Sequence, residues 1–336
     1  MAVSIKDIAR AAGVSHSTVS RALTDSSLVK DETKGRIRRL ADEMGYTPSA
    51  IARSLVRQRT ETIGVVVSTV ADPFVSEVVR GIEETAFNRN FSVVLCESGN
   101  NREREIGAVQ MLRQKRVDGI VVSASTVGDF YMPLLDELDV PIVLVNREQG
   151  TCYAYSVVTD DVHGGALAVQ YLLSLGHQCI GHITGPPSSQ SSHNRLQAYR
   201  QTIESLGLPF DVNCVAPGDG RVVGGREGAS QLLASQYPIT AIFCYNDLTA
   251  IGAILAVKAH GLKVPEDVSI VGFDDIPFAE YVDPPLTTVR QHRYEMGRLA
   301  TEMVLDLLQG NEPEANIYLR GELIVRESCI APVRIV

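Results

Sequence analysis

From Ile63 onward, short apolar runs rich in β-branched residues alternate with amphipathic stretches of helical length. Most of the runs are continuously apolar, which is typical of strands that a parallel sheet buries on both faces. Strands are predicted at residues 63–68, 92–97, 119–124, 141–146, 156–160, 179–184, 213–217, 241–246 and 268–273. Helices are predicted between them, among others at 74–90, 102–115, 162–175, 194–206 and 248–260. This alternation predicts parallel sheets with helices on both faces.

The number of strands predicts two lobes rather than one sheet. Nine strands over about 270 residues exceed what one sheet holds comfortably, and a division near Asp160 leaves two halves with the same strand–helix rhythm. After Pro284 and Pro285 the pattern changes to a short strand, a helix at 294–308 and a last strand at 322–327, which we interpret as crossings between the lobes. Ligands of doubly wound lobes bind beyond the carboxyl ends of the strands, so the cleft between two lobes is a natural ligand site.

The first 60 residues contain no strand-like run and predict a small all-α head. Ser4 begins a first helix whose apolar residues recur at helical spacing, and Gly13 ends it. Ser15 then caps a second helix at 16–23, and a third helix follows at about 31–44. Two helices joined by a short turn with a glycine are the signature of a helix-turn-helix unit.

The second helix carries the residues that would read DNA, because its first half enters the major groove in such a unit. Val19 is needed in the core, which leaves an outward face of His16, Ser17, Ser20 and Arg21, with Thr18 toward a phosphate. An arginine can bind guanine O6 and N7 together, and His and Ser can contact base edges. The alternative is a solvated helix without a partner. Residues 15–22 contain no acidic side chain, which favours DNA binding.

The charge is divided unevenly along the chain. The first 60 residues hold 11 Lys and Arg against 6 Asp and Glu, whereas the remainder holds 20 against 34. A basic head on an acidic body is typical of a chain whose head alone meets a polyanion. Ordinary drift in a window of this length produces such an asymmetry about as readily, so charge alone leaves both interpretations open.

Motifs of catalysis and metal binding are absent from the sequence. It contains no GxxxxGK[ST], HExxH or GxSxG, and its seven histidines and six cysteines have no metal-ligand spacing. We therefore expect neither an enzyme nor a cofactor or metal site. No apolar run reaches the ~18 residues of a membrane helix, and the first residues lack the apolar region of a secretory signal. These features predict a cytoplasmic protein without a membrane partner.

Several motifs resemble those of one family of regulators. In the head they are residues 5–9 (IKDIA), 13–15 (GVS), 17–21 (STVSR) and 45–55 (GYTPSAIARSL). In the body they are residues 115–119 (KRVDG), 175–177 (LGH), 183–186 (ITGP), 271–275 (VGFDD) and 284–289 (PPLTTV). In this order, over nearly the whole chain, they resemble the lactose/galactose repressor (LacI/GalR) family. The resemblance implies a dimeric transcription regulator whose periplasmic-binding-protein-like core binds a small molecule.

Residues 48–55 resemble the hinge helix of that family, which the resemblance places in the minor groove with Leu55 as an apolar wedge. Eight residues are too few for a stable isolated helix, so we expect the hinge to order only on DNA. The alternative is that Leu55 belongs to the core under a tight linker. With the hinge included, the predicted DNA contacts are Ser4, Ser15, His16, Ser17, Thr18, Ser20, Arg21, Ala52, Arg53 and Leu55.

Polar residues just past the strand ends match pocket positions of the ribose-binding type of fold. The predicted effector contacts are Asp72, Phe74, Asn101, Arg147, Arg195, Asn246, Asp274 and Gln291. Asp72 stands where an amide is common, and Asn146 where a carboxylate is common. An Asp after a strand often caps a helix, so Asp247 and Asp275 are interpreted as structural. The charges of Asp72 and Asp274 would balance those of Arg147 and Arg195, which predicts a neutral monosaccharide.

We therefore predict a helix-turn-helix head at residues 1–47, a hinge helix and linker at 48–60 and a two-lobed α/β core of doubly wound parallel sheets at 61–336. The N-lobe would hold about 61–160 plus 291–320, and the C-lobe about 161–290 plus 321–336. The predicted function is a ligand-responsive repressor that binds double-stranded operator DNA as a homodimer. One alternative is a solute-binding receptor for sugar uptake, which would need a signal peptide and no basic head. The other is a sugar-metabolising enzyme, which would need a phosphate loop, a metal cluster or a catalytic pair.

Overall fold

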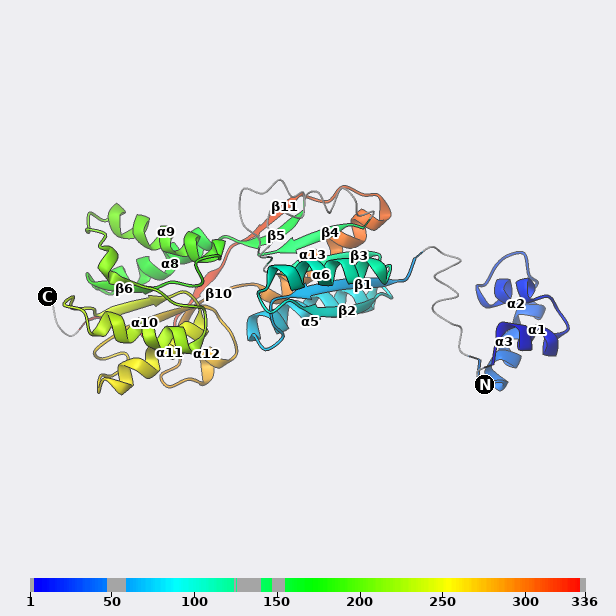
Figure 1. Ribbon diagram of the computed structural model, residues 1–336, viewed down its shortest axis with the longest axis horizontal. Helices are drawn as coiled ribbons and strands as arrows, with labels where there is room; N and C mark the ends of the chain where they lie inside the picture. The colour runs from blue at the N-terminus through cyan, green and yellow to red at the C-terminus, as the bar shows by residue number, and fades with distance from the viewer. Residues whose placement is uncertain (1–2, 47–58, 124, 126–139, 147–154, 333–336) are drawn as a thin grey trace. The chain divides into compact units, whose positions relative to one another are not determined.

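A computed structural model describes residues 3–46, 59–123, 125, 140–146 and 155–332. The chain forms two compact units, Met1–Thr60 and Glu61–Val336. Figure 1 shows that the first unit is built from helices and the second from sheets covered by helices.

The first unit, the head, packs three helices around one small core. They are α1 (Ile5–Ala12), α2 (His16–Leu23) and α3 (Asp31–Glu43). The turn between α1 and α2 needs a left-handed residue, which Gly13 supplies at φ 64°. The buried core consists of Ile8, Ala9, Ala12, Val19, Ala22, Val29, Ile37 and Ala41. Because all three helices contribute, the core fixes the angle at which α2 leaves the turn.

The N-lobe of the second unit is a six-stranded parallel sheet in the order β11-β5-β4-β3-β1-β2. Its strands are β1 (Thr62–Val67), β2 (Ser92–Glu97), β3 (Gly119–Ser123), β4 (Ile142–Val145), β5 (Ser156–Thr159) and β11 (Asn316–Leu319). Helices α5 (Pro73–Asn88) and α13 (Arg293–Gln309) pack on one face, and α6 (Arg102–Gln114) packs on the other. The buried strands alternate their side chains between these two apolar layers, as the continuous apolar runs predict.

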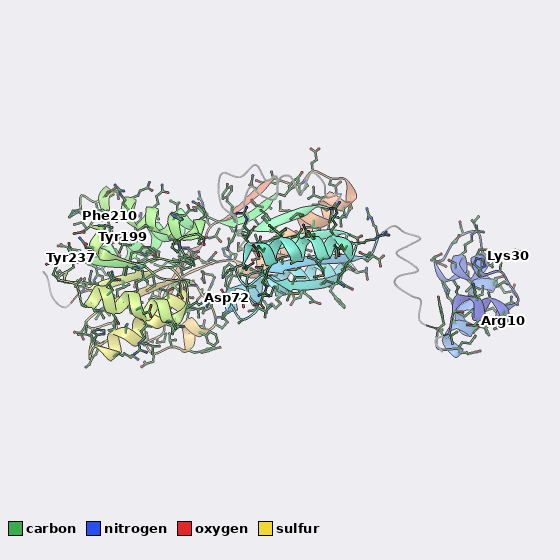
Figure 2. All side chains as sticks on the ribbon, in the orientation of Figure 1. Arg10, Lys30, Asp72, Tyr199, Phe210 and Tyr237 are labelled. Carbon is green, nitrogen blue, oxygen red and sulfur yellow. The ribbon has the colours of Figure 1, made fainter. Side chains whose placement is uncertain are left out.

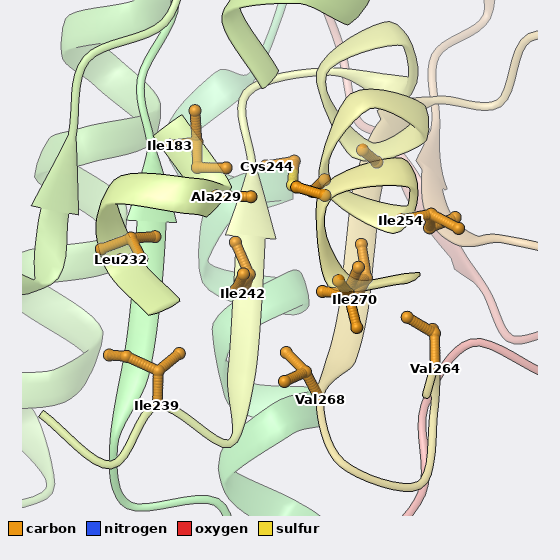
Figure 3. Packing of buried hydrophobic residues seen from close by; sticks show 14 of the residues in the cluster. Ile183, Ala229, Leu232, Ile239, Ile242, Cys244, Ile254, Val264, Val268 and Ile270 are labelled. Atoms are coloured by element: carbon orange, nitrogen blue, oxygen red, sulfur yellow. The ribbon is translucent and has the colours of Figure 1, made fainter. Parts of the chain in front are cut away.

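The C-lobe repeats this plan with the strand order β12-β10-β9-β8-β6-β7. Its strands are β6 (Ile180–Ile183), β7 (Val215–Ala216), β8 (Ala241–Cys244), β9 (Ser269–Asp274), β10 (Thr287–Arg290) and β12 (Glu322–Ile324), of which β12 runs antiparallel to β10. Helices α8 (Asp161–Ser174) and α9 (Gln190–Ser205) cover one face, and α10 (Val222–Leu233) and α11 (Asp247–Ala259) cover the other. Figure 3 shows Leu232 and Ile254 packed with Ile242 and Ile270 of the sheet.

Helix α10 begins in a glycine-rich segment, and Gly224 and Gly225 lie in its first turn. A Cβ on Gly225 would lie 2.1 Å from the carbonyl oxygen of Thr249, and one on Gly252 would lie 2.1 Å from that of Val222. These glycines let α10 and α11 pack backbone against backbone. The sequence pattern did not predict two short elements, which are the edge strand β11 and helix α12 (Phe278–Tyr281). The predicted strand at 213–217 is a two-residue strand, β7, after a 3-10 turn at Val212–Cys214.

Three chain segments join the two sheets, between β5 and α8, between β10 and α13, and between β11 and β12. Along the chain, the predicted effector residues that the structure describes follow the carboxyl ends of β1, β2, β6, β8, β9 and β10. A helical head and two doubly wound lobes are the predicted fold class, which the structure confirms. Within the described part of the chain, no helix has the length and the apolar character that crossing a membrane requires.

Candidate DNA-binding and effector sites

Helix α2 presents the predicted DNA-reading face of the head. The Ser15 hydroxyl accepts a hydrogen bond from the Thr18 N–H at 3.1 Å, which caps the helix. Val19 and Ala22 are fully buried, so the opposite face of α2 points to solvent. On that face His16, Ser17 and Arg21 are exposed, whereas Thr18 and Ser20 are half-buried. The predicted outward residues therefore share one face of one helix.

The basic residues of the head divide into two groups. Nη2 of Arg36 donates to the Ala12 carbonyl at 3.0 Å, and Nη2 of Arg38 lies 2.8 Å from Oδ1 of Asp25, so both are engaged within the head. The guanidinium of Arg21 has no hydrogen-bond or ion-pair partner among the residues that the structure describes. Arg10 and Lys30 are also exposed (Figure 2). Arg21 is thus available to a phosphate or a base edge.

Ser4, the remaining predicted contact in the described part of the head, caps α1. Its N–H and its hydroxyl both donate to Oδ2 of Asp7, at 3.0 and 2.6 Å. These bonds lower the pKa of the Asp7 carboxyl. Ala52, Arg53 and Leu55 of the predicted hinge lie outside the described residues.

In the second unit, Arg195 is held rigidly at the centre of the candidate effector site. Its Nε donates to Oδ1 of Asp161 at 2.9 Å, and its Nη1 donates to the Tyr245 carbonyl at 2.6 Å. The guanidinium carbon lies 3.7 Å from the centre of the Phe273 ring. Only 2% of Arg195 is exposed. Because Asp161 balances its charge, Arg195 can stay buried without an external anion.

Asp274 is the last residue of strand β9, and its carboxylate contacts Gln291 in the connection between β10 and α13. Nε2 of Gln291 donates to Oδ1 of Asp274 at 2.5 Å, and Oε1 of Gln291 accepts from the Thr159 hydroxyl at 2.5 Å. Nη1 of Arg195 is 3.9 Å from the same carboxylate oxygen. Burial raises the pKa of Asp274 to about 7, against the opposing effect of Arg195. The carboxyl can therefore exchange a proton near neutral pH, whereas both ends of the Gln291 amide are already bonded within the protein.

Asp72 lies at the start of α5, just past strand β1 (Figure 2). Its Oδ1 accepts from the Phe74 N–H at 2.9 Å, and the half-buried Phe74 ring packs against the N-lobe core. Burial raises the pKa of Asp72, and the nearby Arg293 partly offsets this. The Asp-Pro-Phe turn therefore caps α5 and also places a carboxylate beside an aromatic ring.

The two predicted asparagines act as helix caps. Oδ1 of Asn101 accepts from the Arg104 N–H at 2.9 Å at the exposed start of α6. Oδ1 of the buried Asn246 accepts from the Thr249 N–H at 2.9 Å, and its Nδ2 donates to the Gly220 carbonyl at 3.0 Å. A ligand would have to share these groups with the backbone. Arg147 lies outside the described residues.

The two aspartates interpreted as structural are engaged within the C-lobe. Oδ2 of Asp247 accepts from the Ile276 N–H at 2.8 Å, and its Oδ1 accepts from the Thr288 hydroxyl. The Asp275 carboxylate pairs with Arg290 and Arg326, each at 2.7 Å. Both carboxylates thus tie β9 to neighbouring segments.

Three residues of the site escaped the sequence analysis: Asp161, Tyr245 and Arg293. Tyr245 and Arg293 lie within two residues of the predicted positions Asn246 and Gln291, and Asp161 directly follows the predicted strand at 156–160. The Tyr245 ring is wedged against Gly185, where a Cβ would lie 2.7 Å from it, and its hydroxyl is 3.3 Å from Oγ of Ser189. In the sequence, only their nearness to a strand end indicates that these residues belong to the site. That nearness does not distinguish the side chains that face the site from their neighbours.

Comparison with known proteins then identifies the family. A model of the LacI family of bacterial regulatory proteins matches residues 4–49, and one of the periplasmic binding protein-like domain matches 169–329. The transcriptional repressor CytR of Escherichia coli (strain K12) is 37% identical over 329 residues, 97% of this chain and 96% of the relative. The repressor PurR of Vibrio atlanticus (strain LGP32) is 32% identical over 327 residues, 97% of this chain and 98% of the relative.

The chain belongs to the LacI family.

Solved structures of LacI-family proteins have the same architecture. The lac repressor dimer bound to operator and the anti-inducer ONPF superposes with a TM-score of 0.90 at 29% identity, over 98% of this chain and all (100%) of that one. A LacI-family regulator from Enterococcus faecium with bound ribose gives 0.73 at 30% identity, over 80% of this chain and 99% of that one. These matches confirm the predicted family and fold.

As a member of the LacI family, the protein is a ligand-responsive DNA-binding transcriptional regulator and not an enzyme. The helix-turn-helix match over residues 4–49 decides against the alternative of a solute-binding receptor for uptake. The domain boundaries and the individual contact residues stay predictions.

Proposed function

We propose that this LacI-family protein represses transcription by binding a near-palindromic operator as a homodimer in the cytoplasm, and that a small neutral sugar controls it. The observation that carries the DNA part is the exposed face of α2, where Arg21 has no partner among the described residues and no acidic side chain occurs. The proposed domains are the head at 1–47, the hinge at 48–60 and the core at 61–336.

The DNA contacts that we propose combine base reading and backbone contacts. Arg21, His16, Ser17 and Ser20 meet base edges, and Thr18, Ser15 and Ser4 lie at the helix starts that face phosphates. Ala52, Arg53 and Leu55 are proposed as minor-groove contacts of the hinge. Arg and Lys that displace counterions from phosphates make the affinity fall steeply with salt.

The dimer that we propose rests on two observations. The lac repressor, similar over 98% of this chain, is a dimer on its operator. The C-lobe also exposes large apolar side chains, among them Phe278 (51% exposed) and Tyr281 (77% exposed) of α12. Exposed apolar residues of this size are common at subunit interfaces. Sedimentation of the DNA-free protein at micromolar concentration measures this directly.

The neutral effector follows from the charges around Asp274. Of the described residues at the site, Asp72, Asp161 and Asp274 carry carboxylates, and Arg195 and Arg293 carry guanidiniums. Among these described residues, an anionic ligand such as a phosphosugar would meet one more carboxylate than guanidinium. Hydroxyls can donate to Asp274 and Asp72, and Phe74 can cover an apolar face of a sugar ring. Two similar regulators were solved with cellobiose and with ribose.

The DNA-binding proposal is tested by selecting operators from a randomised duplex library. We expect Arg21→Ala to relax base preference at one position of each half-site, at a cost of about 1–3 kcal/mol per half-site. Arg38→Ala, at an exposed arginine that is paired with Asp25, is the matched control and should leave selectivity unchanged. Wild-type selectivity in the Arg21 variant would contradict the placement of α2.

The effector proposal is tested by a thermal-shift panel of monosaccharides, nucleosides and purines. A sugar at about 100 times its Kd should stabilise the core by about 2.7 kcal/mol. Asp274→Ala should abolish the shift. A panel in which only a phosphosugar or a free nucleobase raises the Tm would contradict the neutral-sugar assignment.

A further inference from the structure

Arg293, the first residue of α13, has a guanidinium with unused hydrogen-bond donors. Its Nη2 donates to the Asp275 carbonyl at 2.5 Å. Its Nε and Nη1 are buried, and none of the described residues accepts a hydrogen bond from them. Buried donors without an acceptor are rare in folded proteins, because the lost hydration is not replaced. This side chain therefore calls for an explanation beyond folding.

The other arginines around it are fully engaged within the protein. Nη1 of Arg326 donates to the Leu286 carbonyl at 2.9 Å, and its Nη2 lies 2.7 Å from Asp275. Nε of Arg290 donates to the other oxygen of Asp275 at 2.7 Å. The Asp275 carboxylate thus already has two guanidinium partners, and Arg293 reaches only the backbone of that residue.

The surroundings of Arg293 show where its free donors could be used. Its bond to the Asp275 carbonyl holds it next to Asp274, and its charge partly offsets the burial that raises the pKa of Asp274 and of Asp72. Oδ1 of Asp72 accepts from the Phe74 N–H at 2.9 Å. Free donors on Arg293 and carboxylate oxygens on Asp72 form a complementary pair of groups in one neighbourhood.

We propose that Arg293 is a specificity-determining residue of the effector site, where Nε and Nη1 donate to a neutral hydroxyl or carbonyl oxygen of the ligand. This inference rests on the proposed function and specifies one chemical group of the effector, a neutral hydroxyl or carbonyl oxygen near Asp72. A hydroxyl there accepts from Arg293 and donates to Asp72. A carboxylate or phosphate is disfavoured in that place, because Asp72 and Asp274 would repel it. The site therefore selects ligands with a second polar group besides the one that Asp274 binds.

The first test needs no ligand. A residue whose role is ligand binding commonly lowers the stability of the ligand-free protein, whereas a residue whose role is structural raises it. Arg293→Met removes the unused donors at nearly constant length, and Arg326→Met is the matched control from the engaged set. In the ligand-free protein we expect the Tm of Arg293→Met to equal or exceed that of the wild type and the Tm of Arg326→Met to fall by several degrees. An Arg293→Met protein that melts as early as Arg326→Met, or that does not fold, overturns the proposal.

The second test uses D-ribose, D-glucose and their 2-deoxy forms as probes in the thermal-shift assay. For every probe that raises the wild-type Tm, Arg293→Met should weaken binding at least tenfold, and Arg293→Lys should recover part of it. Unchanged binding of such a probe by Arg293→Met overturns the inference. If no probe shifts the wild type, the sugar proposal fails and the ligand-free comparison still decides the role of Arg293.

Discussion

Removing the charge of Asp161 tests how the effector site is held together. In Asp161→Asn, Arg195 loses its buried counterion but keeps an acceptor oxygen of similar size. The two side chains are 3% and 6% exposed, and Nη2 of Arg195 lies 2.7 Å from the carboxylate. Removing one partner of a buried pair costs about 3–5 kcal/mol, because the remaining charge is uncompensated.

The structure places the expected cost at the lower end of this range. The asparagine still accepts one hydrogen bond, and Nη1 of Arg195 still donates to the Tyr245 carbonyl at 2.6 Å. We therefore expect a loss of about 3 kcal/mol. At about 2–4 °C per kcal/mol for domains of roughly 150–250 residues, the Tm of the core should fall by about 6–12 °C.

Calorimetry of the DNA-free protein measures this loss, with Glu204→Gln as the matched control. Glu204 pairs with Arg200 at 2.9 Å on the same helix, but the two side chains are 44% and 58% exposed. An exposed pair contributes about 0–1 kcal/mol, so the control should melt close to the wild type. The double variant Asp161→Asn/Arg195→Met removes both charges of this pair and should recover part of the loss. Equal melting temperatures for Asp161→Asn and Glu204→Gln would refute this reasoning.

Three further predictions concern the hinge, the titration of the site and helix packing. Leu55→Ala should weaken specific DNA binding and bending while the Tm of the DNA-free protein stays unchanged; a core leucine would instead cost about 2–5 kcal/mol. Burial raises the pKa of Asp274 from 3.8 to about 7. The stability that its protonated form contributes is therefore lost as the pH rises from 4 to 7. Over that range the Tm of Asp274→Asn should increase relative to the Tm of the wild type, because the variant has no carboxyl to ionise at this position. Gly225→Ala places a Cβ 2.1 Å from the Thr249 carbonyl and should lower the Tm, whereas Gly35→Ala on α3, with no atom within 4 Å, should raise it slightly.

Prediction of the fold succeeded where local chemistry decides the structure. Continuous apolar runs such as 119–123 are typical of strands between two layers of helices, and Ser15 caps α2 as its position before the apolar residues predicts. At α10 the local signal is weak, because Gly224 and Gly225 lower the helix propensity of its first turn. The helix forms there because only glycine lets it approach α11 so closely. The edge strand β11 likewise forms because it pairs with β5, and a pattern of neighbouring residues does not predict pairing with a distant strand.

The sequence by itself determined the helical head, the parallel sheets and the strand ends at which ligands bind, because periodicity, capping and turn residues act over a few positions. Only the tertiary structure decided what each polar residue at those ends does. It joined Arg195 to Asp161, 34 residues earlier, and to the Tyr245 carbonyl, 50 residues later. It also engaged both ends of the Gln291 amide and left Nε and Nη1 of Arg293 without an acceptor in the described part of the chain. Hydrogen bonds between distant segments depend on where the folded backbone places them, and a one-dimensional pattern does not contain that placement.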